Sequence, residues 1–226
     1  MPRSTRLLIA AIVTMTAAFT QAPAEELPAD LLNRVRDKTF RAAMAAKTDP
    51  EKLTAISQLN ALARYGDMPA RWALVRNYHQ AQVVRKVVSP EDAVRYGLDV
   101  LASKPEGVEK ADFEFIFVLS KLYEEGNRRV FGLTLVDAMR DDPRLRDPAL
   151  LGEILQRAAF APGACDGVLE AARIGGFAGK GEEGCSDEVR DFLIEHTAKR
   201  GPLGKPEAER EAVSADLKAM DADDAQ

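Results

Sequence analysis

The chain has 226 residues, a formal charge of −5 at pH 7, two histidines and two cysteines. This acidic balance argues against nucleic acid, or an anionic membrane surface, as the main partner. A chain of this length can bury a sizeable core, so it needs no metal or cofactor in order to fold.

The first 24 residues have the three-part layout of a secretory signal peptide. Arg3 and Arg6 supply a basic start, residues 7–19 form an apolar run, and small residues close the segment at Ala24. The run is too short to span a bilayer, which needs about 20 apolar residues. We therefore expect cleavage after Ala24, a periplasmic or secreted location, and no stable membrane insertion of the mature chain. A buried N-terminal helix is the alternative.

Proline marks the start of several expected helices. It is tolerated at the first helical position because its missing N–H would have no partner there, and a short polar residue before it caps the free amides. This arrangement occurs in four segments: 48–52, 66–70, 88–93 and 146–150. Apolar residues at three- and four-residue steps then predict helices. The expected helices span residues 28–46, 50–64, 68–82, 90–103, 110–125, 129–140, 148–160, 165–175 and 186–199.

The segment 112–123 is the one place where the sequence also suggests a strand. Every second residue from Phe113 to Phe117 is a phenylalanine, as in a half-buried strand. However, apolar residues also step by four from Ala111 to Tyr123, and the neighbouring segments are helical. We therefore expect a buried helix here, and an all-α fold class for the chain.

One pattern of small and bulky residues occurs twice. Small residues let paired helices approach closely, while Leu and Tyr fill the groove against the next pair. A single helix pair cannot bury its own apolar faces, so pairs stack into a curved array. The first copy is Ala70, Leu74 and Tyr78 followed by Ala93, and the second is Phe115, Leu119 and Tyr123 followed by Ala138.

The first copy resembles a known repeat. The segment 66–78, GDMPARWALVRNY, is similar to the first helix of a Sel-one-like repeat, a family related to the tetratricopeptide repeats. Val75 stands where that family usually has a glycine, and the resemblance covers about residues 61–140. Ala93 and Tyr96 look similar to the second helix of the repeat, displaced by two residues. The matching positions are Gly66, Asp67, Ala70, Leu74 and Tyr78, then Leu119, Tyr123 and Gly126.

The resemblance implies an α-solenoid of about four antiparallel helix hairpins within residues 25–202. Members of this family serve as adaptors or regulators, and exported members look like partners of envelope proteins. The family shares no catalytic residues that could be carried over to this chain. A partner protein in the cell envelope is therefore what the resemblance implies.

The two cysteines lie in the C-terminal part of the domain, residues 148–202. In an oxidising compartment, Cys165 and Cys185 are expected to form a disulfide, with two reduced thiols as the alternative. The glycine-rich segment 175–184 between them lacks the spacing of a phosphate-binding loop, and Gly181 stands where that loop needs a hydroxyl. We interpret it as a loop held by the cysteines.

Candidate binding residues gather near the first repeat copy. Trp72, the only tryptophan, is offset by roughly 160° from the stripe that begins at Ala70, at 100° per residue. An aromatic residue there can anchor a partner, but a lone tryptophan in a helix pair more often packs against the neighbouring helix. Arg71 and Arg76 form a basic strip beside it, so these three are the possible partner-binding residues.

No residue is expected to act in catalysis, to bind a cofactor or to bind a metal. His79 and His196 have no ligand-spaced neighbours, and neither has an evident acid-and-nucleophile arrangement. At a helix end, a histidine cation would interact favourably with the helix dipole. Residues 203–226 are acidic and poor in large apolar groups, and we expect a flexible tail outside the core.

The sequence thus favours a non-catalytic scaffold that binds an envelope protein, with no nucleic acid as partner. One alternative is an envelope enzyme or enzyme subunit with a site near segment 175–184. Another is a small-ligand or glycan binder, which would need exposed aromatic residues along a groove. The aromatic content of 6% does not favour that alternative.

Overall fold

The structure is a computed structural model, and it describes residues 26–78, 80–103, 128–179 and 184–222. Throughout these ranges the regular structure is helical, with no strand. The expected all-α class is confirmed. The expected signal peptide, the expected helix 110–125 and most of the second repeat copy lie outside the described residues.

The helices follow the expected ones closely. The expected helix 68–82 is the exception, because it ends at Tyr78 and a separate short helix begins at Gln82. None of the helices in the described ranges is long and apolar enough to cross a bilayer. The elements are α1 (Ala29–Ala45), α2 (Asp49–Tyr65), α3 (Met68–Tyr78), α4 (Gln82–Val87), α5 (Pro90–Ser103), α7 (Arg128–Asp141), the 3₁₀ helix η1 (Pro143–Arg146), α8 (Pro148–Ala158), α9 (Ala164–Ile174), α10 (Asp187–Ala198) and α11 (Lys205–Ala222).

Polar caps fix where several helices begin. Thr48 and Glu51 form a capping box at the start of α2, each side chain bonding the other's backbone N–H. Asp147 accepts from the backbone N–H of Leu150 at 2.8 Å, and Ser186 caps α10 in the same way. These caps satisfy amides that have no partner inside the helix, so the starts are set locally.

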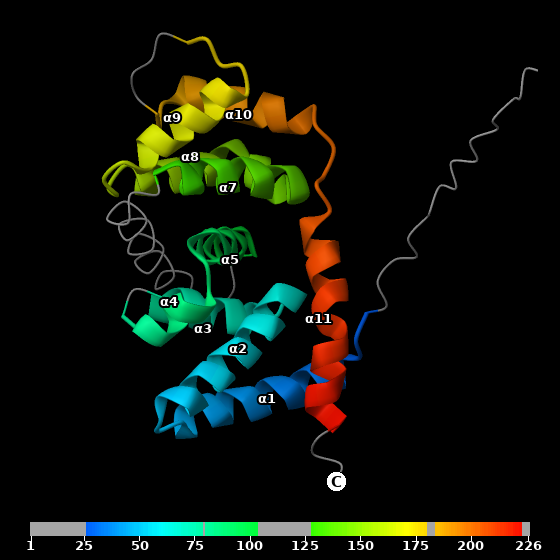
Figure 1. Cartoon of the computed structure of the whole chain (residues 1–226). Helices are drawn as coiled ribbons and strands as arrows, with labels where there is room; N and C mark the ends of the chain where they lie inside the picture. Colours follow the sequence, from blue (N-terminus) through cyan, green and yellow to red (C-terminus); the bar gives the residue numbers. More distant parts are fainter. Residues whose placement is uncertain (1–25, 79, 104–127, 180–183, 223–226) are drawn as a thin grey trace, which may run out of the picture.

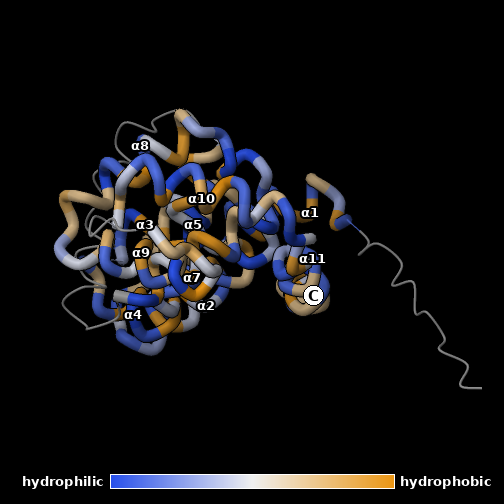
Figure 2. Tube along the Cα trace, turned by 90° about the horizontal axis from the view of Figure 1, so that it is seen from above, coloured by the Kyte–Doolittle hydropathy of each residue, from blue (hydrophilic) through white to orange (hydrophobic). Residues whose placement is uncertain are grey.

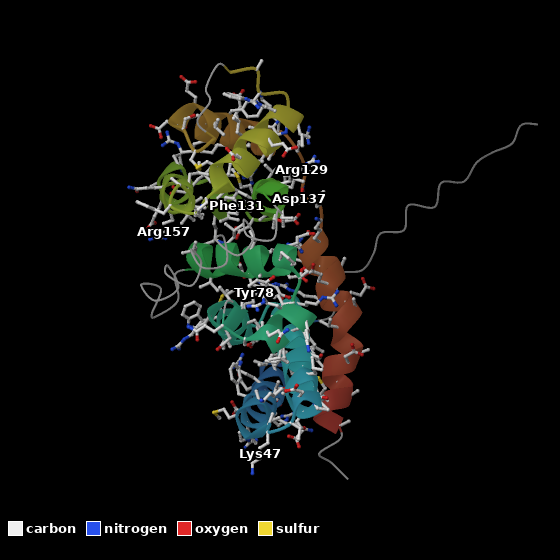
Figure 3. All side chains as sticks on the ribbon, turned by 60° about the vertical axis from the view of Figure 1, so that its left-hand side comes forward. Lys47, Tyr78, Arg129, Phe131, Asp137 and Arg157 are labelled. Atoms are coloured by element: carbon white, nitrogen blue, oxygen red, sulfur yellow. A yellow bond between two sulfur atoms is a disulfide. The ribbon has the colours of Figure 1, made fainter. Side chains whose placement is uncertain are left out.

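The helices stack in chain order, as Figure 1 shows from α1 at one end to α10 at the other. Helix α1 packs on α2, α2 on α3, α3 on α5, α5 on α7 and α7 on α9. One hydrophobic core runs through the stack, and Tyr78 lies within it between α3 and α5 (Figure 3). The largest fully buried side chains are those of Tyr78, Tyr96, Phe131, Leu62, Leu74, Leu98, Leu135, Met139 and Leu145.

Small residues permit a close approach between the backbones of α7 and α9. A Cβ added at Gly132 of α7 would overlap the backbone carbonyl of Gly167 of α9. Only glycine at position 132 therefore lets the two backbones meet. The alanines of the repeated pattern, Ala70, Ala93 and Ala138, are all buried.

The C-terminal segment differs from the expectation. Residues 205–222 form the helix α11, which packs against α2 and α1, so a flexible tail outside the core is wrong for this segment. Val213 and Leu217, one helical turn apart, are buried in the common core. Figures 1 and 2 both place α11 along one side of the stack, running back toward α1.

The expected disulfide is confirmed. Cys165 and Cys185 are bonded, with their Cα atoms 5.0 Å apart, which is within the usual range for a disulfide. The bridge joins the start of α9 to the chain just before α10. Gly184 lies so close to the carbonyl of Cys165 that any Cβ there would overlap it, so the chain enters α10 at a fixed point.

A matched pair of glycine substitutions tests the α7–α9 contact. Gly132→Ala should lower the free energy of unfolding by about 1–3 kcal/mol, because the helices must move apart. Gly152→Ala, within α8, is the control: its new Cβ would come no closer than 3.7 Å to Arg190, and we expect a gain of about 0.5–1 kcal/mol from helix propensity. Urea unfolding of both variants measures the difference, and equal effects of the two would contradict this packing.

Candidate functional site

A hollow opens between α1, α2, α3 and α4, with a volume of about 370 Å³. Phe40, Met44, Ile56 and Val83 line it, and Lys52 is the ionisable residue of its wall. Phe40, Ile56 and Val83 are half-buried and pack on the core, whereas Met44 is 79% exposed. Methionine adapts its shape easily, which suits the rim of a binding surface.

A second hollow, of about 500 Å³, lies along the outward face of α3. Pro69, Trp72, Arg76 and neighbouring polar residues line it at helical spacing, and Phe40 of α1 closes its other side. The two hollows share Phe40, Ala73 and Asn77. They therefore form one continuous surface, which we term the apolar groove.

The groove owes its shape to the junction between α2 and α3. Gly66 ends α2 with a φ of 115°, in the left-handed region that favours glycine. Asp67 then accepts from the backbone N–H of Ala70 at 2.9 Å and so caps α3. The carboxylate of Asp67, almost completely buried, also pairs with Arg36 of α1. One side chain thereby sets the angle of α3 to both earlier helices.

The three residues expected to bind a partner do not share one face. Trp72 and Arg76 both line the groove, whereas Arg71 points into the opposite side of α3. There it donates to the carbonyl of Ala63 at 2.7 Å, pairs with Asp99 and lies over the ring of Tyr96 at 5.5 Å. Arg71 is therefore engaged in holding α2, α3 and α5 together.

A charged cleft of about 390 Å³ lies on that opposite side, between α3, α5, η1 and α11. Its charges neutralise one another: Arg95 pairs with Glu209 at 2.6 Å, and Asp99 is shared by Arg71 and Arg144. An ion entering the cleft would have to break these pairs. The sequence did not reveal this cleft because α11, which supplies one wall, was not expected to pack on the stack.

Side chains of the types that bind metals are scattered over the described parts of the chain. No group of three or more His, Cys, Asp or Glu residues there could hold a metal ion. Phe177, in the glycine-rich segment, packs on Phe192, with ring centroids 5.1 Å apart. His79 and residues 180–183 of that segment lie outside the described residues.

His196 stacks on Phe192 at 5.3 Å near the end of α10. Burial lowers the pKa of its imidazole, and the nearby cations Arg200, Arg140 and Lys199 lower it further. The helix dipole alone would favour a cation at this position. The surroundings of His196 instead favour the neutral ring, so the expected role as a helix-end cation is not supported.

Comparisons with protein-family models, with curated proteins and with solved structures find no significant match to this chain. The resemblance to the Sel-one-like family therefore stays a prediction from the residues quoted above. The geometry of the groove is the observation that bears on the function of this protein.

The lowered pKa of His196 predicts a pH dependence of stability. The imidazole has a higher pKa in the unfolded chain, near 6.5, so acid favours the unfolded state. The stabilisation is present above pH 6.5 and is lost as the pH falls below that value. His196→Phe keeps a ring beside Phe192 and removes the titration. From pH 7.5 to 5.5 the wild type should lose more stability to urea than the variant, and an equal loss in both would contradict the prediction.

Proposed function

We propose that this protein is an exported, non-catalytic helical scaffold that binds another protein of the cell envelope through the apolar groove. The observation that carries the proposal is the groove itself, where Trp72, Phe40 and an exposed Met44 lie along one continuous surface. Aromatic residues and methionine are enriched at protein interfaces, and a few buried anchors such as tryptophan carry most of the binding energy there.

Two further observations support the proposal. The helices stack in chain order, which is the arrangement that an α-solenoid of Sel-one-like type would have. A disulfide between Cys165 and Cys185 suits an oxidising compartment, as does the signal-peptide layout of the first 24 residues. An adaptor or regulator in the envelope is the role that best accounts for all three features.

A photo-crosslinking amino acid placed at position 44 tests the proposal in intact cells. We expect it to capture one predominant protein, identified by mass spectrometry. The same amino acid at position 160 is the control, because Phe160 is also an exposed apolar residue, at 75%, but it follows α8 and lines neither hollow of the groove. Equal capture of the same protein from both positions would contradict the proposal.

Purified components then provide the quantitative measurement. Met44→Asp places a charge where the partner would bury an apolar side chain, so binding of the captured protein should weaken roughly tenfold or more. Phe160→Asp should leave the affinity unchanged. Both sites are exposed, so neither variant should unfold the chain. A captured protein that binds Met44→Asp as tightly as the wild type would rule out the groove as its site.

A further inference from the structure

The charges that line the apolar groove are of one sign. Among the described residues of its two hollows, the ionisable ones are Lys52 and Arg76, both cations. The whole chain carries a net charge of −5, so this local balance is opposite to that of the protein. Neither cation has an ion pair with another described residue, whereas Arg36, Arg71, Arg95 and Arg144 are all paired with carboxylates.

The two cations stand at different parts of the groove. Lys52, in the first turns of α2, belongs to the hollow that contains Met44. Arg76, near the end of α3, belongs to the hollow that contains Trp72. Phe40 lies in both hollows, so the apolar residue that they share is accompanied by one cation in each hollow. A partner that fits this pattern has an apolar middle with carboxylates flanking it.

The backbone N–H and C=O groups of a bound partner must also find hydrogen-bond partners. An extended peptide that binds by adding a strand needs an exposed sheet edge, and the described groove walls are helices and the turn with Gln80 and Ala81, without a strand. The side chain of Asn77 already donates to the carbonyl of Ala73 at 2.8 Å. A helix satisfies its own backbone and needs only side-chain contacts. The outward face of α3 from Pro69 to Asn77 runs about 12 Å at 1.5 Å per residue, enough to lie against about two turns of such a helix.

We propose that the occupant of the apolar groove is an amphipathic helical segment of the partner protein, with an apolar stripe and an acidic residue on each side. Its carboxylates pair with Lys52 and Arg76, and its stripe covers Phe40 and Met44. This inference rests on the proposed function, because it names the kind of partner that the same groove takes. It further assigns Lys52 and Arg76 as the residues that select an acidic partner.

Designed peptides test the selection directly. The probes are fluorescent, hydrocarbon-stapled helices of about four turns with one leucine stripe, flanked by Glu, by Gln or by Lys, and they are measured by anisotropy against the full-length exported protein. We expect the Glu helix to bind about fivefold more tightly than the Gln helix and the Lys helix to bind weakest. The preference should shrink as salt rises, because exposed charges are screened.

Charge reversal in the protein supplies the decisive comparison. The double variant Lys52→Glu, Arg76→Glu should invert the order, so that the Lys helix binds most tightly. Arg173→Glu, at an exposed position of α9 away from the groove, is the control and should keep the order of the wild type. Both cations of the groove lie at partly or fully exposed positions, so the double variant should fold, and circular dichroism checks that it does.

Three outcomes would overturn the inference. In the first, the three helices bind with equal affinity. In the second, Met44→Asp weakens the binding of none of them. In the third, sedimentation shows that the protein self-associates through a contact that Met44→Asp abolishes. The first two leave the proposed function standing as long as crosslinking from position 44 still captures a partner. Loss of that capture is the separate result that defeats the proposed function.

Discussion

Helix α11 returns along the stack, and its burial of Val213 and Leu217 joins segments that are otherwise connected only through their neighbours. Each fully buried aliphatic side chain contributes about 1.5–3 kcal/mol, more than the exposed ion pairs beside it, which contribute about 0–1 kcal/mol each. The polar contacts instead fix where the helix lies. Asp141 of α7 accepts from the backbone N–H of Gly204 at 3.0 Å, and Lys205 pairs at 2.7 Å with Asp137, which Figure 3 shows near the start of α11.

The C-terminal part of α11 forms hydrogen bonds with two of the elements that shape the apolar groove. Arg210 donates to the carbonyl of Tyr65 at 3.0 Å, at the junction where α2 gives way to α3. Arg34 of α1 makes two hydrogen bonds to Asp221, and this pairing holds the pKa of the Asp221 carboxyl below its usual value. The helix that carries Phe40 and the junction that sets the angle of α3 are thus both attached to α11. Two of the elements that shape the groove are therefore held from outside it by the last helix.

Local signals in the sequence were enough to predict the helices and the disulfide, but not the return of α11. Caps, prolines and three- and four-residue steps act within one turn, so they show where α2 or α10 begins. Burial of α11 rests on two apolar residues among alanines and charges, and it becomes favourable only once α1 and α2 present a surface. For the same reason the helical angle of Trp72 could separate it from the stripe of Ala70, Leu74 and Tyr78, whereas it could not show that Phe40 and Met44 lie near it. The inward orientation of Arg71 likewise depends on Asp99 and Tyr96, which lie in a later helix.

Amide hydrogen exchange of the oxidised chain can show whether α11 is an integral part of the fold. We expect the amides of residues 209–220 to exchange nearly as slowly as those in the middle of α2, because both belong to one cooperative unit. Leu217→Ala should speed exchange in both helices. Exchange of residues 209–220 at the rate of an unstructured chain, with α2 still protected, would contradict the account and restore the interpretation of a free acidic tail.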